Sequence, residues 1–83
     1  MSETIESVVY DFVVEEFLYG DGEVDPDEDL IEAGVLDSMT FLRLLEFLDT
    51  RFGVEVHLGD LTMDRFNTLN RVVGYLISQG ATV

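Results

Sequence analysis

Apolar residues recur at helical spacing in three stretches of the chain, and the first stretch predicts a helix over about residues 3–19. Its apolar positions are three or four apart or adjacent, so they share one face; they are Ile5, Val8, Val9, Phe12 and Val13. Ser2 or Thr4 can cap the start, and the triplet Gly20-Asp21-Gly22 ends the helix.

The second stripe predicts a helix over residues 37–52 that stops at Gly53. Its core positions are Phe41, Leu44, Leu45, Leu48 and Phe52. Met39 and Leu42 fall on the other side of this helix, beside Ser38. Two interpretations remain open: this pair adds to the core, or it is an exposed apolar pair where a partner docks.

The third stretch predicts a short helix over residues 61–66, with Thr62 as a possible cap, and a last helix over residues 67–79 that starts at Asn67 or Thr68. Its apolar positions are Phe66, Leu69, Val72, Val73, Leu76 and Ile77. No strand-like alternation persists anywhere. The expected architecture is a single all-α domain over residues 1–83, a small up-and-down four-helix bundle of three main helices and one short helix.

A long connection over residues 20–37 joins the first two helices, and long connections often carry function. Gly34 is expected to supply a turn with positive φ. The acids of this connection imitate a calcium-binding EF-hand in part, at Asp21, Glu23, Asp25 and Glu32. However, Pro26 stands where the EF-hand needs glycine, so the sequence predicts no metal site here.

The composition narrows the choice of partners. The chain of 83 residues carries a formal net charge of −14 and has no cysteine. Such a surface repels phosphate backbones and anionic membranes, and it attracts partners with basic patches. No apolar run is long enough for a membrane span, and the acidic start is not a signal peptide. We expect a cytoplasmic monomer.

Ser38 is the candidate reactive residue. A catalytic serine needs a base within reach, but the only histidine is His57, in the loop after the second predicted helix, and a Gly-x-Ser-x-Gly elbow is absent. The sequence therefore predicts that the protein is not an enzyme. Either Asp37 or Ser38 can cap the helix, and Asp37 can do so while the Ser38 hydroxyl carries a modification.

The stretch Asp29-Leu30-Ile31-Glu32-Ala33-Gly34-Val35-Leu36-Asp37-Ser38-Met39, with its spacing to Phe52-Gly53 and to Phe66-Asn67-Thr68-Leu69, resembles the acyl and peptidyl carrier proteins. The resemblance implies a carrier fold without chemistry of its own. It also implies a 4′-phosphopantetheine arm on Ser38, transferred from coenzyme A, with Asp37 as part of the motif that the transferase recognises.

The same resemblance implies three kinds of partner: a phosphopantetheinyl transferase, an adenylating or acyl-transferring enzyme, and a downstream synthase or transferase. Docking should be weak and salt-sensitive. The expected docking residues surround Ser38 and are Glu32, Met39, Leu42, Arg43, Glu46 and Asp49.

Three features of the sequence bear on the cargo that the arm would carry. The second predicted helix is less acidic than its counterpart in fatty-acid carriers, because it contains Thr40, Leu42 and Arg43. The segment from Leu61 to Asn70 resembles D-alanyl and other aminoacyl carriers, although those D-alanyl carriers have tryptophan in place of Phe66 and proline in place of Leu69. We expect Phe41, Phe47 and Phe52 to fill the interior, which keeps the cargo outside.

One rival interpretation belongs to another class of protein. An acidic helical adaptor without a prosthetic group would bind a partner helix through Met39, Leu42 and their neighbours. Met1 and the short ends favour a free-standing carrier over a domain excised from a larger synthase.

Overall fold

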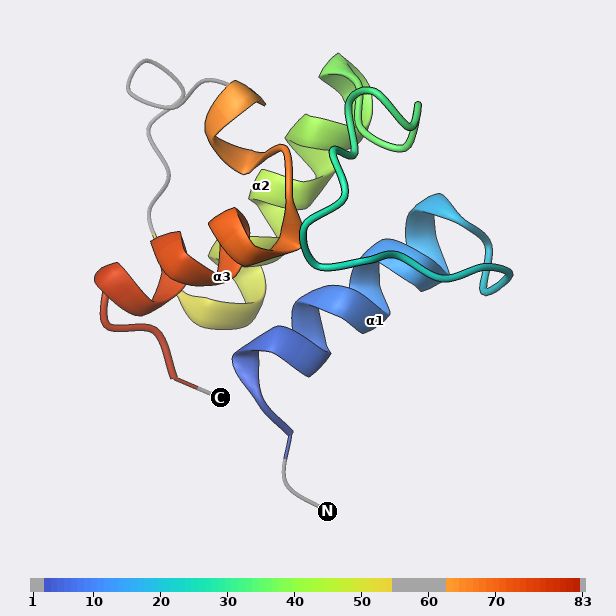
Figure 1. Ribbon diagram of the computed structural model, residues 1–83. Helices are drawn as coiled ribbons and strands as arrows, with labels where there is room; N and C mark the ends of the chain where they lie inside the picture. Colours follow the sequence, from blue (N-terminus) through green and yellow to red (C-terminus); the bar gives the residue numbers. More distant parts are fainter. Residues whose placement is uncertain (1–2, 55–62, 83) are drawn as a thin grey trace.

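The computed structural model describes residues 3–54 and 63–82. These residues form three α-helices and one short 3₁₀-helix: α1 (Ile5–Phe17), α2 (Ser38–Phe52), η1 (Met63–Phe66) and α3 (Leu69–Ser78). The two described ranges hold no strand, and the predicted all-α class is confirmed (Figure 1). The short fourth element is a single 3₁₀ turn. Its expected cap, Thr62, and the histidine His57 lie outside the described residues.

Helix α1 begins after Thr4, one of its two expected caps. The backbone N–H of Ser7 donates to the Thr4 hydroxyl at 3.0 Å, and the Ser7 hydroxyl oxygen accepts the Thr4 N–H at 2.9 Å. The helix ends at Phe17, two residues before its expected end. Tyr19 and Gly20 both have positive φ, at 55° and 75°, and therefore cannot continue a right-handed helix.

Helices α2 and α3 each follow a capping residue that was a candidate in the sequence. Asp37 caps α2, which starts at Ser38, and Gly53 ends it with a left-handed φ of 68°. Thr68 caps α3, so Asn67 is outside this helix and α3 is shorter than the predicted range. Each of these starts satisfies backbone N–H groups that would otherwise lack partners.

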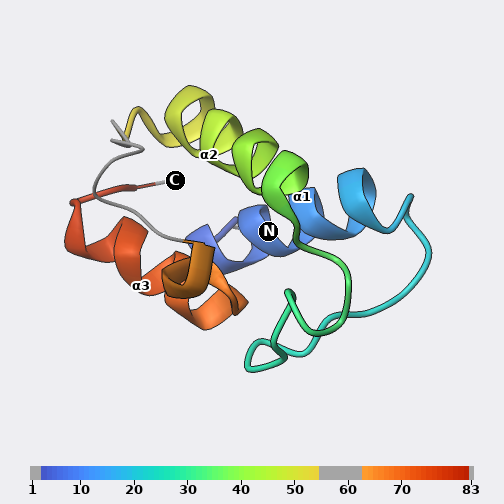
Figure 2. The ribbon, with the colours of Figure 1, turned by 90° about the horizontal axis from the view of Figure 1, so that it is seen from above.

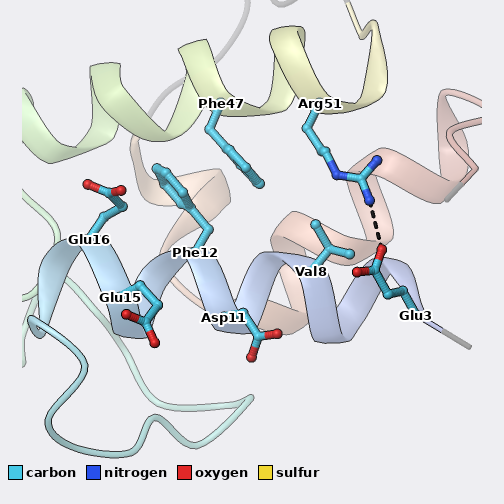
Figure 3. Close-up of a pocket in the computed structure, with 8 residues that line it drawn as sticks. All are labelled: Glu3, Val8, Asp11, Phe12, Glu15, Glu16, Phe47 and Arg51. Atoms are coloured by element: carbon cyan, nitrogen blue, oxygen red, sulfur yellow. Dashed lines mark hydrogen bonds and ion pairs between the residues drawn. The ribbon is translucent and has the colours of Figure 1, made fainter. Parts of the chain in front are cut away.

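Among the described residues, fourteen apolar side chains are buried and form the core: Val9, Val13, Val24, Leu30, Leu36, Phe41, Leu44, Leu45, Leu48, Val54, Phe66, Leu69, Val72 and Leu76. Phe66 is fully buried, with its ring centroid 5.8 Å from that of Phe41. The expected placement of the other rings is wrong in part. Phe47 and Phe52 are only half-buried, and Phe47 stacks on Phe12 at 3.9 Å between α1 and α2 (Figure 3).

The buried stripe of α3 is narrower than its apolar spacing predicted. Leu69, Val72 and Leu76 are buried, Val73 is half-buried, and Ile77 keeps 61 % of its surface exposed. Adjacent residues of a helix point about 100° apart, so Leu76 and Ile77 do not both face the same core.

Helices α1 and α2 run side by side in opposite directions (Figure 2). Two ion pairs join them, each at 2.9 Å: Glu3 with Arg51 near the start of α1, and Glu16 with Arg43 near its end. Both pairs are largely exposed, so they align the helices more than they stabilise them. Helix α3 packs against α1. No helix in the described part of the chain has the length and apolarity that crossing a bilayer requires.

The long connection between α1 and α2 is attached to the first turn of α3 and to the residue Asn67 just before that helix. Four hydrogen bonds join them: Leu30 N to Asn67 O at 2.7 Å, Asn67 Nδ2 to Asp29 Oδ2 at 3.0 Å, Asn70 N to Pro26 O at 3.1 Å and Asn70 Nδ2 to Asp27 Oδ1 at 2.6 Å. Gly34 has the expected positive φ, at 77°. These hydrogen bonds therefore hold the connection in place before the chain reaches the start of α2.

Candidate functional site

Ser38 is the first residue of α2 and is exposed. Its hydroxyl makes no hydrogen bond within residues 3–54 and 63–82. The other two serines of these ranges differ: the Ser7 hydroxyl donates to Thr4 O at 3.0 Å, and the Ser78 hydroxyl donates to Tyr75 O at 2.7 Å. Ser38 is therefore an exposed serine whose hydroxyl has no hydrogen-bond partner among the residues that the structure describes.

Asp37 does the capping that Ser38 could have done. One of its carboxylate oxygens accepts the N–H groups of Met39 and Thr40, at 3.0 and 2.9 Å. The Thr40 hydroxyl oxygen accepts the Asp37 N–H at 2.7 Å and completes a capping box. Hydrogen bonds, first of all from the Thr40 N–H and then from Met39, hold the pKa of the Asp37 carboxyl below its ordinary value.

Sequence reasoning missed the part that Thr40 plays here. The signal was present, because a hydrogen-bonding side chain three residues after a capping Asp is the spacing of a capping box. The Thr40 hydroxyl also donates to the carbonyl of Val35 at 3.2 Å. This second bond links the first turn of α2 to the connection before it, and so fixes the angle at which Ser38 enters the helix.

The connection supports Ser38 through two buried leucines, Leu30 and Leu36. The N–H groups of Val35 and Leu36 both donate to the carbonyl of Leu30, at 2.9 Å. Ser38 is thus only two residues beyond a buried anchor, so its backbone is held while its side chain faces outward.

Asp29 fastens the base of this connection. Its carboxylate accepts the N–H groups of Ile31 and Glu32, at 3.0 and 3.1 Å, and the side-chain N–H of Asn67. The Glu32 N–H, the Asn67 amide and the Ile31 N–H hold the pKa of Asp29 below its ordinary value of 3.8, and the positive charge of Arg71 adds to them. Its role was not foreseen from the sequence, because its partner Asn67 is 38 positions away.

Asp29→Asn is expected to make the stability of the protein depend less on pH at the acidic end of the range. Because the pKa of Asp29 is lower in the folded protein, its carboxylate stabilises the fold above pH 3.8, and this contribution disappears as the pH falls through the folded-state pKa. Urea unfolding from about pH 6 to about pH 3 should show the midpoints of variant and parent converging as the pH falls. Glu28→Gln, at an exposed acid of the same connection, is the matched control. Midpoints that stay equally far apart at every pH would refute the assignment.

The residues expected to dock partners lie as follows. Met39 is 74 % exposed and Leu42 is 51 % exposed, so the interpretation of this pair as additional core is wrong. Glu32, Glu46 and Asp49 are exposed as well, and Arg43 is paired with Glu16. An apolar pair thus stands beside the Ser38 hydroxyl, with acids around it.

The acids of the described ranges do not converge on a metal site. No group of three or more His, Cys, Asp or Glu side chains there is placed to hold an ion. Of the calcium-site candidates, the Asp25 carboxylate accepts the N–H of Asp27 at 2.9 Å, which is a local turn.

Known proteins match most of this chain. The family model described as "Phosphopantetheine attachment site" matches residues 9–76. A D-alanyl carrier protein of Streptococcus sanguinis is 39 % identical over 61 residues, which are 74 % of this chain and 77 % of the relative. D-alanyl carrier proteins of Streptococcus suis and Streptococcus thermophilus are 34 % and 38 % identical, over 78 % and 74 % of this chain and 82 % and 77 % of their own lengths.

A solved structure shares the fold. A chain in a crystal structure of an FAD-dependent dehydrogenase superposes with a TM-score of 0.72, over 82 % of this chain and 97 % of that one, at 23 % identity. This likeness supports the helical architecture alone. The match over residues 9–76 and the D-alanyl carrier relatives do more, and together they show that the chain belongs to the phosphopantetheine-attachment family of carrier proteins.

Proposed function

We propose that Ser38 is the residue that bears 4′-phosphopantetheine, and that this chain carries an aminoacyl group on it without performing catalysis. The observation that carries the proposal is the division of labour at the start of α2. Asp37 holds the free N–H groups of the helix, and the exposed Ser38 hydroxyl is left without a partner among the described residues. The residues present therefore fit an attached group. The terminal thiol of the bound arm supplies thioester chemistry to the cargo.

The position of Ser38 suits attachment by a separate enzyme. A modifying enzyme must reach the serine oxygen, and a residue at the first turn of a helix, outside the core, offers that access. The arm must also swing away from its carrier, and the exposed position of Ser38 suits that movement. Attachment to the carrier raises the effective concentration of the cargo at each enzyme that the carrier visits.

The surface around Ser38 is proposed as the docking face for those enzymes. Met39 and Leu42 offer apolar contact, and Glu32 and Glu46 offer negative charge to basic patches. Arg43, which is held by Glu16, adds a positive charge and would discriminate between partners. The proposed partners are a phosphopantetheinyl transferase, an adenylating enzyme that loads the thiol, and a transferase that unloads it in the cytoplasm.

An aminoacyl cargo, D-alanine first among the candidates, is supported by the names of the relatives and by the aromatic rings that occupy the interior. Three of the relatives, at 34–39 % identity, are D-alanyl carrier proteins. The interior is occupied by the rings of Phe41 and Phe66, which favours a small cargo that stays outside the bundle.

Incubation with coenzyme A and a broad-specificity phosphopantetheinyl transferase is expected to add the mass of one phosphopantetheine. Cleavage after glutamate then yields residues 33–46, which contain no serine other than Ser38, and this fragment should carry the whole gain. A folded protein that gains no mass would refute the carrier proposal in favour of a binding adaptor. A mass gain on another fragment would refute the assignment of Ser38 as the attachment residue, but not the carrier proposal.

A further inference from the structure

We propose that a groove between the start of α1 and the end of α3 is a second docking surface, which takes a basic amphipathic segment of a partner protein. The groove has a volume of about 450 Å³. Its lining is Glu3, Thr4, Ile5, Glu6, Val73, Ile77, Ala81 and Thr82. None of these residues belongs to the site around Ser38.

The groove lies at the far end of α2 from Ser38. The ion pair between Glu3 and Arg51 places the start of α1 beside the last turn of α2. The 15 residues of α2 span about 20 Å. Figure 1 shows the same separation, with the start of α1 and the end of α3 away from the light-green start of α2. A partner segment in the groove would therefore leave Ser38 accessible.

An apolar strip forms the floor of the groove. Ile77 is 61 % exposed, which makes it one of the few large apolar side chains on the described surface. Ile5, Val73 and Ala81 are half-buried and line the groove with Ile77, and Ile5 and Ala81 also pack against the core. Exposed apolar residues that adjoin one another are typical of protein contact sites, whereas an isolated one is common on any surface.

The charge around the strip is negative from two sources. Glu6 stands on its α1 side and has no ion-pair partner in residues 3–54 or 63–82, whereas Glu3 beside it is paired with Arg51. On the other side is the carboxyl end of α3, where the helix dipole is negative and the last turn contains no basic residue. An apolar floor between two negative rims complements a helix or strand that carries Leu or Ile together with Lys or Arg.

The same charge disfavours the other occupants. A second copy of this chain would bring another 14 negative charges to the contact, and an anionic lipid surface would be repelled in the same way. A positively charged protein segment is the occupant that satisfies both the floor and the rims.

The test uses a fluorescent amphipathic peptide of leucine and lysine at helical spacing. Binding should perturb the backbone amide signals of residues 3–6 and 73–82, and Ile77→Gln should weaken it about tenfold, since one isoleucine contact is lost. Tyr19→Asn is the matched control. It removes an exposed ring at the opposite end of α1, and asparagine tolerates the φ of 55° at that position. A peptide with glutamate in place of lysine should not bind.

Three results would overturn the proposal. The peptide binds elsewhere if the perturbed amide signals centre on residues 38–46. The same conclusion follows if the parent and Ile77→Gln bind the peptide with equal affinity. Concentration-dependent self-association that Ile77→Gln abolishes, seen by sedimentation equilibrium, would assign the groove to a second copy. Circular dichroism checks that Ile77→Gln is folded, and this variant should still accept phosphopantetheine, so failure here is distinguishable from failure of the assignment of Ser38.

Discussion

Ser38→Ala is expected to fold as the parent does and to accept no phosphopantetheine. The complete loss follows because the hydroxyl oxygen is the only atom of this side chain that can form the phosphodiester. The fold should persist because Asp37 and Thr40 make the hydrogen bonds at the start of α2, and alanine is a good helix former. The free energy of unfolding should change by less than about 0.5 kcal/mol. Intact mass after incubation with coenzyme A and transferase measures loading, and urea unfolding measures stability.

The control for this variant is Ser78→Ala. Ser78 is an exposed serine at the end of α3, and its hydroxyl is engaged by the Tyr75 carbonyl at 2.7 Å. Its replacement should leave the mass gain intact. Loading that survives in Ser38→Ala would show that another hydroxyl accepts the arm, and a Ser38→Ala protein that unfolds would show that the hydroxyl supports the helix after all.

Phe66→Ala is expected to lower the free energy of unfolding by about 3–5 kcal/mol, which is a large share of the stability of a domain this size. The ring of Phe66 is fully buried, 5.1 Å from the ring of Tyr75 and 5.8 Å from that of Phe41. Its removal leaves a cavity between η1, α2 and α3 that neighbouring side chains fill only in part. Urea or guanidinium unfolding followed by circular dichroism gives the difference.

Phe47→Ala is the matched comparison, because it deletes the same ring from a half-buried position. Phe47 stacks on Phe12 at 3.9 Å, near the surface between α1 and α2. Its loss should therefore destabilise the protein less than Phe66→Ala does. If Phe47→Ala proves the more damaging change, the interior is organised around α2 as the sequence spacing alone suggested, and this description of the core is wrong.

Local signals in the sequence were sufficient for the helices and for the position of Ser38. Thr4, Asp37 and Thr68 are capping residues with a recognisable side chain, and Gly53 ends α2 with the positive φ that glycine favours. These features depend on neighbours within four positions, which is the range over which a sequence pattern is informative. For the same reason, the division of capping and exposure between Asp37 and Ser38 was available as one alternative before the structure was known.

Features that depend on distant contacts could not be predicted in this way. The hydrogen bonds from Asn67 and Asn70 to the connection join residues 38 and 43 positions apart. The apolar period also identified which residues share a stripe but not how deep each one lies, so it placed Phe52 and Ile77 with the core and gave no priority to Phe66. The end of α1 was missed because Tyr19 adopts a positive φ that its residue type does not favour.

The cap at the start of α2 has a thermodynamic consequence. Because the Asp37 carboxylate holds the free amides, esterification of the neighbouring oxygen breaks no hydrogen bond that the helix needs. If Ser38 carries the arm as proposed, folding and loading should be nearly independent of each other, and the loaded and unloaded forms should unfold at about the same temperature. Loading would then leave the susceptibility of the protein to unfolding unchanged, because the start of α2 keeps its own hydrogen bonds in both forms.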